Sequence, residues 1–314
     1  MAFMGIPNPA TLLEFQDRLG SESACEEYLF QWRWPGGFRC PRCGGDEATR
    51  LSTRRQYQCH DCRHQVSVTA GTALHKTKLP LRVWFWAIFL VARHKKSISA
   101  AQLRSDLGLG SYRTAWLLLH KIRACFDESL DYPLVGLVEV DEAYVGGSEK
   151  GAMAGRAAGN KGIVITGVEV KQSGRLGSAR MKVIPDVRAR SLTPFVAANV
   201  DLQATVATDG WPGFNEIERL GYRRDRHVSK GPRNAEFRPV LDGVHLMISN
   251  LKTWLQGRFH GVSRKYLPAY VAEFVYRFNR RRSPPDLFGW VTRRLMTREA
   301  VTLSAIRATT DVCA

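Results

Sequence analysis

Two Cys-x-x-Cys pairs constrain the fold of this chain more than any other feature of its sequence. Cys40 and Cys43 precede Cys59 and Cys62, with fifteen residues between the pairs. Four thiolates at this spacing are typical of one tetrahedral Zn²⁺ site, whereas a redox-active dithiol would not require two matched pairs. The sequence therefore predicts a zinc ribbon over residues 36–72. Because all four ligands are cysteines, the zinc is expected to hold structure and to do no chemistry.

The charge balance narrows the kind of partner that the chain binds. The 314 residues include 46 Lys and Arg against 29 Asp and Glu, a formal net charge of +17. Such an excess indicates a polyanionic partner, either nucleic acid or an anionic membrane surface. The apolar run 83–91 is too short to cross a bilayer, and the first ten residues do not resemble a signal peptide. We expect a cytoplasmic, nucleoid-associated protein that binds double-stranded DNA.

Helical patterns flank the predicted ribbon on both sides. Residues 1–35 are predicted to form a helical segment, because their apolar residues recur at helical spacing. Residues 78–128 contain three helical stretches, with glycines and a capping Ser111 before the third, which is typical of a helix-turn-helix. In that motif the last helix enters the major groove, whereas the alternative is a three-helix bundle with a charged exterior. The predicted DNA contacts from this helix are Arg113, Lys121 and Arg123.

Residues 132–285 alternate strand-like and helical patterns, which predicts an α/β catalytic domain. The runs 134–141 and 204–208 are rich in β-branched residues, and each leads to an aspartate, Asp141 or Asp209. Carboxylates at the ends of neighbouring strands are what two-metal phosphoryl transfer requires, and they suit Mg²⁺ or Mn²⁺. The sequence therefore predicts two catalytic divalent ions, held chiefly by these aspartates.

A third ligand is expected from a helix packed across the sheet. The candidates are Glu236, Asp242, His245 and Asn250. His245 and Lys252 are seven residues apart, which is about two helical turns, so they share a helix face. Further along, an arginine cluster is either a solvated helix end or a track for DNA phosphates, and in so basic a chain we favour the track. Its members are Arg277, Arg280, Arg281 and Arg282, and residues 286–314 follow as a basic C-terminal tail.

The motifs in combination closely resemble one group of bacterial insertion-sequence transposases. They are the four cysteines, the stretch 138–147, Thr208-Asp209-Gly210, the run 257–263 and the matches from Tyr270 to Arg281. The resemblance spans nearly residues 10–285 and implies a DDE-type, RNase H-like catalytic domain after a zinc ribbon. The expected fold is multidomain: an N-terminal helix plus zinc ribbon, a helix-turn-helix, then an α/β RNase H-like mixed sheet with flanking helices.

The resemblance also implies an activity and a set of site residues. Terminal inverted repeats would be cut with the help of two metals, and the freed 3′-OH would be joined to target DNA, which implies at least a homodimer. Asp141 and Asp209 fall on the two aspartates of the family pattern. Many relatives carry a glutamate seven residues before a lysine, and here these positions are His245 and Lys252. The chain thus reads Asp-Asp-His-Lys.

The histidine at the third position leaves several interpretations open. His245 is a working third ligand, or it marks a decayed copy, or the true ligand is Asn250 or Glu236. A neutral imidazole ligates divalent ions, although Mg²⁺ prefers oxygen. Accordingly the alternatives to a transposase are a non-catalytic zinc-ribbon DNA-binding protein and a metal-dependent nuclease without strand transfer.

Overall fold

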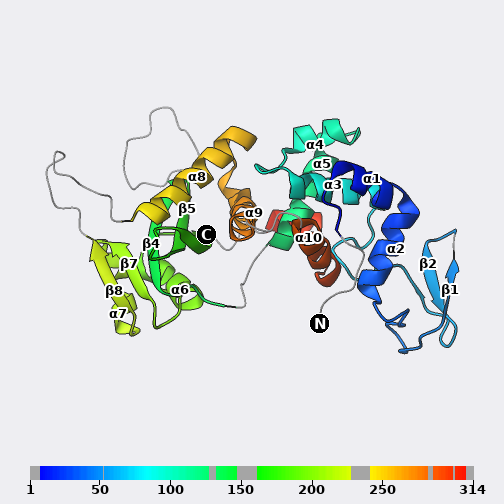
Figure 1. The fold of residues 1–314 in the computed structure, drawn as a ribbon, viewed down its shortest axis with the longest axis horizontal. Coiled ribbons are helices and arrows are strands. Elements are labelled where there is room, and N and C mark those ends of the chain that lie inside the picture. The colour runs from blue at the N-terminus through cyan, green and yellow to red at the C-terminus, as the bar shows by residue number, and fades with distance from the viewer. Residues whose placement is uncertain are drawn as a thin grey trace. The chain divides into compact units, whose positions relative to one another are not determined.

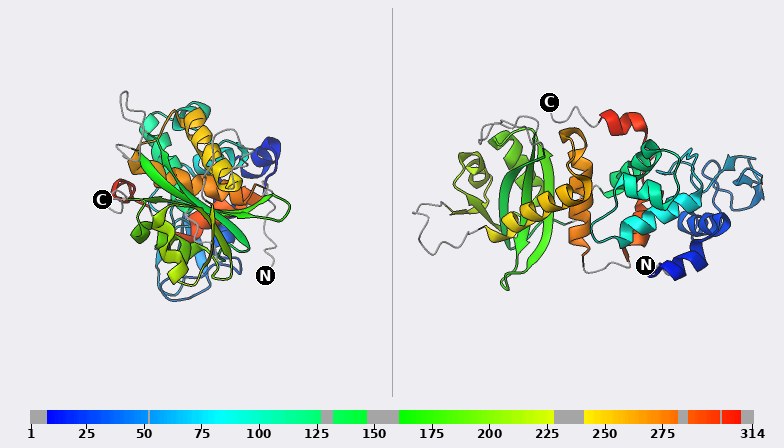
Figure 2. Two further views of the ribbon diagram at one scale, coloured as in Figure 1. Left: turned by 90° about the vertical axis from the view of Figure 1, so that its left-hand side faces the viewer. Right: turned by 90° about the horizontal axis from the view of Figure 1, so that it is seen from above.

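The computed structural model describes residues 8–51, 53–126, 132–146, 161–227, 241–281, 286–299 and 301–308. Its contacts divide the chain into two units, whose helices and strands are drawn in Figures 1 and 2. The N-terminal unit comprises Met1–Cys125 and Ser283–Ile306, and the sheet unit comprises Phe126–Arg282 and Arg307–Ala314. Two of the predicted site residues, Glu236 and Arg282, lie outside the described residues.

Four helices of the N-terminal unit share an aromatic core. They are α1 (Leu12–Leu19), α2 (Glu22–Arg33), α3 (Leu81–Arg93) and α10 (Asp286–Thr297). Ring centroids in this core lie 4.6–6.4 Å apart, which suits edge-to-face and tilted packing, between the side chains of Phe15, Tyr28, Phe85, Phe89 and Phe288. Residues 286–297 of the predicted basic C-terminal tail form α10, which supplies Phe288 to this core.

The predicted N-terminal helical segment is divided into α1 and α2. Thr11 caps α1 by accepting from the N–H of Glu14, and Ser21 caps α2 by accepting from the N–H of Ala24. The break falls at Gly20, where an added Cβ would lie 2.3 Å from the carbonyl oxygen of Gln16. Only glycine fits there without a shift of the helix end.

The three-stranded ribbon and two further helices complete the N-terminal unit. The ribbon is antiparallel, in the order β1 (Ala48–Leu51), β2 (Gln56–Cys59) and β3 (Gln65–Val66). The helices are α4 (Ala100–Asp106) and α5 (Tyr112–Arg123), whose N-caps are Ser99 and Ser111. The predicted helices and the predicted Ser111 cap are thus confirmed, whereas the assignment of α4 and α5 as a DNA-reading helix-turn-helix stays a prediction.

The sheet unit is built on a five-stranded mixed sheet in the order β6-β5-β4-β7-β8. β4, β5 and β6 form an antiparallel meander, whereas β7 and β8 run parallel to β4. The bounds are β4 (Leu137–Val145), β5 (Gly162–Val170), β6 (Leu176–Ile184), β7 (Thr205–Asp209) and β8 (Arg223–His227). Three antiparallel strands followed by two parallel ones on the other side of the first strand are the RNase H-like arrangement.

Helices cover both faces of this sheet. α6 (Ala189–Asn199) packs on one face, where Phe195 and Val196 meet Val138 and Val140 of β4. α8 (Asp242–Phe259) and α9 (Leu267–Asn279) pack on the other face, as Figure 2 shows. Short elements complete the chain: the 3-10 turns Ala124–Phe126, Pro212–Phe214 and Arg264–Tyr266, and the helices α7 (Glu216–Arg219) and α11 (Leu303–Ala308). Within the described ranges, no helix is both long and apolar enough to cross a membrane.

The strand bounds correct one expectation about Asp141. The sequence placed this residue near the end of a strand over residues 134–141, but β4 continues to Val145. The antiparallel pairing with β5 extends over the whole of β4, whereas the parallel pairing with β7 stops at Val140. Asp141 therefore lies in mid-strand, at the point where β4 loses its neighbour on the β7 side.

Candidate active site and zinc site

The four predicted zinc ligands lie together at one end of the ribbon. The sulfur atoms of Cys40, Cys43, Cys59 and Cys62 are all within 4.8 Å of one another. Sγ of Cys40 is 3.6 Å from Sγ of Cys62, and Sγ of Cys43 is 3.5 Å from Sγ of Cys59. A tetrahedral site with Zn–S bonds of about 2.3 Å has sulfur–sulfur edges of about 3.8 Å. The donor set and its spacing therefore fit Zn²⁺.

The two halves of this site have matching backbone turns. The N–H of Gly44 donates to the carbonyl of Cys40, and the N–H of Arg63 donates to the carbonyl of Cys59. Gly44 and Arg63 both have positive φ angles, +81° and +58°, so each turn closes through a left-handed residue. The equivalent geometry is why each Cys-x-x-Cys pair presents both sulfurs in one direction.

In the sheet unit, register brings the two predicted aspartates side by side. Val140 of β4 pairs with Thr208 of β7, and the next residues are Asp141 and Asp209. Neighbouring strands are about 4.8 Å apart, and in-register residues of parallel strands point to the same face. Asp141 and Asp209 therefore lie next to each other on the face that α8 covers.

The third predicted ligand approaches Asp141 from α8. Nε2 of His245 lies 3.2 Å from Oδ2 of Asp141, and the His245 side chain is 53% exposed against 16% for Asp141. Lys252 is exposed on α8, two turns further on and on the same side of the helix. Asn250 is turned by about 140° from His245 around the helix axis, so it does not share this face. Of the described candidates, His245 is the one that contacts Asp141.

Burial and neighbouring charge set the electrostatics of this face. Burial raises the pKa of Asp141 above its ordinary value, and the negative charge of Asp209 raises it further. The amide N–H of Glu142 and the side chain of His245 act in the opposite direction. Because burial is the largest of these effects, the protein disfavours the ionised form of Asp141, and a bound divalent cation would favour it.

The three groups do not form a closed ligand set. Oδ1 of Asp209 accepts a hydrogen bond from the N–H of Trp211 at 3.0 Å, which directs this carboxylate toward its own turn. Among the described residues, the cysteines are the only group of three or more potential ligands that lie mutually within 4.8 Å. Asp141 and His245 are thus in contact, whereas the Asp209 side chain lies more than 4.8 Å from at least one of them.

Glu139 is a site residue that sequence reasoning missed. It is 5% exposed, and its Oε2 accepts from the N–H of Val244 at 2.9 Å, in the first turn of α8. The N–H of Gly243 donates to the same carboxylate. Glu139 lies two residues before Asp141, so strand alternation places both on one face, and an acid within an apolar strand requires a buried partner. That alternation was the signal available in the sequence.

The predicted DNA contacts on α5 differ in their exposure. Arg113 is exposed near the N-terminus of α5, beside Tyr112, which is 54% exposed. Lys121 is half-buried, with Nζ 5.9 Å from the centroid of the Trp84 ring, and burial lowers its pKa. Arg123 is only 2% exposed, so the expectation that it faces DNA is corrected.

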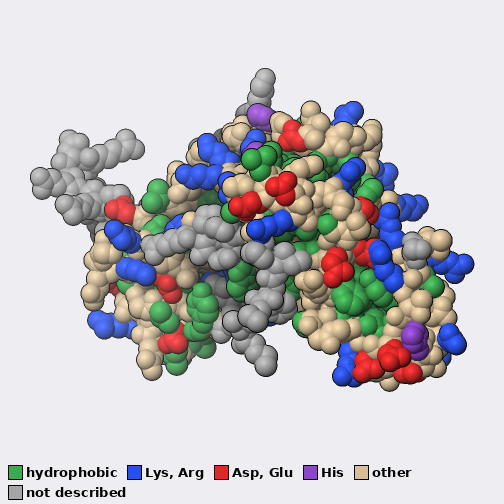
Figure 3. Space-filling model, turned by 45° about the vertical axis from the view of Figure 1, so that its right-hand side comes forward, with side chains coloured by type: hydrophobic (Ala, Val, Ile, Leu, Met, Phe, Trp, Pro, Cys, Tyr) green, Lys and Arg blue, Asp and Glu red, His purple; other side chains and the backbone are tan. Residues whose placement is uncertain are grey.

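The arginines in the last turn of α9 and just after it are engaged with the protein itself. Nε of Arg277 donates to Oε1 of Glu273 at 2.9 Å, and the two side chains are 11% and 1% exposed, which argues against Arg277 as a phosphate contact. The Arg280 guanidinium lies 4.3 Å from the centroid of the Tyr276 ring, and Arg281 donates to the carbonyl of Leu176. On the face drawn in Figure 3, Lys and Arg side chains are scattered among Asp and Glu and form no single patch.

Two family models match the chain. The transposase zinc-ribbon domain matches residues 20–65, and the ISXO2-like transposase domain matches residues 133–279. The chain thus carries both of the domains that these models describe, a transposase zinc-ribbon domain and an ISXO2-like transposase domain. A protein of Halobacterium salinarum, described as an uncharacterized protein in transposable element ISH50, is 27% identical to it over 278 residues. That alignment covers 82% of this transposase and 90% of the relative.

Solved structures with some similarity to this transposase are viral integrases. The catalytic core domain of BIV integrase is 18% identical, with a TM-score of 0.32, over 47% of this chain and 85% of that one. A simian T-cell lymphotropic virus intasome in complex with PP2A regulatory subunit B56 gamma is 16% identical, with a TM-score of 0.26, over 73% and 72%. The RNase H-like arrangement of the sheet unit follows from its own strand order.

Proposed function

We propose that this chain is a DNA transposase whose sheet unit cuts the ends of its own element and joins the freed 3′-OH to target DNA. Asp141, Asp209 and His245 are the proposed ligands of two Mg²⁺ or Mn²⁺ ions. The observation that carries the proposal is the in-register pair of aspartates on β4 and β7, with His245 of α8 contacting Asp141. The family match supports the same reaction class.

The donor set fits divalent cations at this face. Carboxylate oxygens are the ligands that Mg²⁺ and Mn²⁺ prefer, and a divalent cation would favour the ionised form of Asp141, which burial disfavours. Bound there, such ions would supply activation of the attacking oxygen and stabilisation of the leaving oxygen. Asp141 is fixed by a central strand, and His245 is held against it by α8. Lys252, exposed on the same helix face, would contact the DNA backbone or the scissile phosphate as a point charge.

DNA recognition is assigned to the N-terminal unit. The zinc ribbon and α5 are the proposed readers of the terminal inverted repeats, with Arg113 and Tyr112 as the exposed contacts near the start of α5. Arg280 and Arg281 remain proposed contacts to the DNA backbone. Arg123 and Arg277 are not proposed as DNA contacts, because their side chains are buried. Because two ends must be joined in one event, the working form on DNA is proposed to be a homodimer or a higher oligomer, acting in the cytoplasm on the nucleoid.

A cleavage and joining assay tests this proposal. Purified full-length protein is incubated with labelled terminal-repeat DNA and Mg²⁺ or Mn²⁺, and nicked and joined products are separated on gels. Asp141→Asn is expected to lower the rate at least about a hundredfold, because several kcal/mol of metal-mediated charge stabilisation are lost. The control Glu216→Gln changes a half-buried carboxylate of the same unit that pairs with Arg219, and it should leave the rate unchanged.

The same assay tests His245 and separates the rival functions. His245→Glu is expected to keep or raise the Mg²⁺-dependent rate, because the new ligand is an oxygen. Complete loss in this variant would indicate a site built around imidazole. DNA binding that is unchanged by metal, with no cleavage under any divalent ion, contradicts the proposal and favours a non-catalytic DNA-binding protein. Cleavage without joining favours a nuclease.

A further inference from the structure

An arginine of β8 with a buried side chain, Arg224, contacts the backbone of the turn that follows Asp209. The Arg224 side chain is 1% exposed, and its guanidinium donates hydrogen bonds from all three nitrogens. Nε donates to Oγ1 of Thr208 at 2.7 Å, and Nη1 donates to Oδ1 of Asn215 at 2.7 Å. Nη2 donates to the carbonyl of Asp209 at 2.9 Å and to the carbonyl of Trp211 at 3.3 Å.

All four acceptors belong to one short segment, residues 208–215. β7 ends at Asp209, so the backbone beyond this residue has no sheet ladder to hold it. Arg224 supplies hydrogen bonds on both sides of that end, and Arg226 adds one from Nη2 to the carbonyl of Gly210 at 3.0 Å. Because the Asp209 carboxylate accepts from the N–H of Trp211, its direction depends on this same backbone.

The bonds made by Arg224 need a guanidinium. Burial lowers the pKa of Arg224, and the nearest acidic partner, Glu218, is 3.9 Å away and 56% exposed. The cation is therefore satisfied mainly by neutral oxygens. Those oxygens are spread around a planar fork of donors, which the ammonium of lysine cannot reproduce.

We propose that Arg224 is a positioning residue that fixes the Asp209 carboxylate relative to Asp141 and so sets the affinity of this face for its divalent ion. The inference rests on the proposed function, because it takes Asp209 as a metal ligand. Arg224 acts through the backbone of residues 208–211, on the face opposite the carboxylates, and touches neither DNA nor metal.

Mn²⁺ binding measures this role directly. Full-length zinc-loaded protein is titrated with Mn²⁺, and free Mn²⁺ is followed by electron paramagnetic resonance. Asp141→Asn should abolish one Mn²⁺ site. Arg224→Lys should lower the Mn²⁺ affinity of that same site about tenfold, which corresponds to about 1.4 kcal/mol. The control Arg223→Lys changes the preceding, exposed arginine of β8 and should leave Mn²⁺ binding unchanged. In the cleavage assay, Arg224→Lys should need more Mg²⁺ but approach the normal rate at saturation.

A merely structural role would not give this split between metal affinity and saturated rate. Folded Arg224→Lys protein that binds Mn²⁺ as tightly as the parent overturns the inference. If Arg224→Lys does not fold, Asn215→Ala removes only the exposed acceptor of Nη1 and should weaken Mn²⁺ about threefold, the effect of one hydrogen bond. Unchanged affinity in that variant also overturns the inference. A parent protein without any Asp141-dependent Mn²⁺ site overturns the proposed function as well.

Discussion

Glu139 joins the strand that carries Asp141 to the helix that carries His245. Its carboxylate accepts from the first-turn N–H groups of α8, where helix termini leave donors without intrahelical partners and favour negative charge. His245 follows Val244 directly, so the contact that anchors α8 is adjacent to the contact that reaches Asp141. One residue thus sets the distance between a proposed ligand on the strand and a proposed ligand on the helix.

Substitutions at Glu139 should separate hydrogen bonding from charge. Glu139→Ala leaves buried N–H groups without an acceptor and is expected to destabilise the sheet unit by about 1–3 kcal/mol. Glu139→Gln keeps one acceptor and removes a buried charge. Since burial raises the pKa of Glu139, ionisation opposes folding above the folded-state pKa, and this cost disappears as pH falls through it.

Thermal unfolding at two pH values checks this reasoning. At pH 7 Glu139→Gln should be as stable as the parent or more stable. As pH falls from 7 toward 4.5, the ordinary pKa of a glutamate side chain, the parent should gain on the variant, because only the parent takes up a proton at this position. Asp141 also has a raised pKa, but it is present in both proteins and cancels in the comparison. If Glu139→Gln lost as much stability at pH 7 as Glu139→Ala, the buried charge of Glu139 would not be the destabilising factor.

At the scale of elements, α8 lies against the sheet because Gly243 lets it approach. An added Cβ at this position would come within 2.9–3.0 Å of Leu176, Val170 and the carboxylate of Glu139. Gly257, near the other end of the same helix, has nothing within 4 Å of an added Cβ. The two glycines of one helix therefore form a matched pair for substitution.

Gly243→Ala should move α8 away from β4, whereas Gly257→Ala should not. We expect Gly243→Ala to cost about 1–3 kcal/mol through overpacking and to weaken Mn²⁺ binding, because His245 leaves Asp141. Gly257→Ala should stabilise the helix by about 0.5–1 kcal/mol with unchanged Mn²⁺ affinity. Denaturant unfolding and the Mn²⁺ titration measure both effects. Equal destabilisation by the two variants would show that the close approach at Gly243 is unimportant.

Elements with strong local signals were predictable from the sequence, and elements without them were not. β7 lies within one residue of the predicted run 204–208, because that run is rich in β-branched residues and leads to Asp209 and Gly210. The sequence suggests no strand at β8, whose residues Arg223-Arg224-Asp225-Arg226-His227 have no apolar alternation. β8 forms because β7 offers it a parallel ladder, which is a tertiary effect. The extension of β4 beyond Asp141 has the same origin in its pairing with β5.

The candidate site likewise contains residues that could be predicted from the sequence and residues that could not. Asp141, Asp209 and His245 were accessible from motif and spacing, and the register places them together. Arg224 was not accessible, because the residues that it holds are nine to sixteen positions away and belong to another strand and its turn. The burial of Arg123 and Arg277 was equally hidden, since a charged residue on an amphipathic helix is normally solvated.

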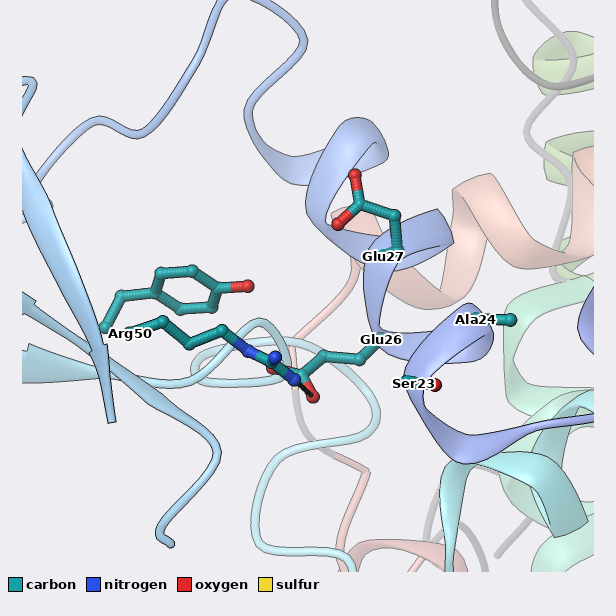
Figure 4. Close-up of a pocket in the computed structure, with 6 residues that line it drawn as sticks. Ser23, Ala24, Glu26, Glu27 and Arg50 are labelled. Atoms are coloured by element: carbon teal, nitrogen blue, oxygen red, sulfur yellow. Dashed lines mark hydrogen bonds and ion pairs between the residues drawn. The ribbon is translucent and has the colours of Figure 1, made fainter. Parts of the chain in front are cut away.

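At the scale of the whole molecule, the zinc site and the aspartates belong to different units. Within the N-terminal unit, Arg50 of β1 reaches the buried Glu26 of α2, with Nη2 2.7 Å from Oε2 (Figure 4). Loss of the ribbon would leave Glu26 buried without its partner, and an uncompensated buried charge is strongly destabilising. Damage to the zinc site should therefore spread to α2 within this unit.

Cys59→Ser should remove zinc and DNA binding but spare the proposed metal site of the sheet unit. Zinc content, measured by mass spectrometry, is expected to fall from about one per chain, and binding to terminal-repeat DNA is expected to be lost. Mn²⁺ affinity should be retained, because the sheet unit has its own buried cores. Cys25→Ala, which changes a buried cysteine outside the cluster, should keep its zinc. Loss of Mn²⁺ binding in Cys59→Ser would contradict the independence of the two units.

The charged sequence of β8 also affects whether the sheet pairs with other chains. β8 is the last strand on its side of the sheet, so its outer backbone groups have no strand partner within the described residues. Such an edge invites pairing with the edge of another chain, and natural proteins discourage this with charged side chains. Four of the five residues of β8 are Arg or Asp, and three of those are exposed. The strand that steadies the Asp209 turn therefore also protects the sheet against aggregation.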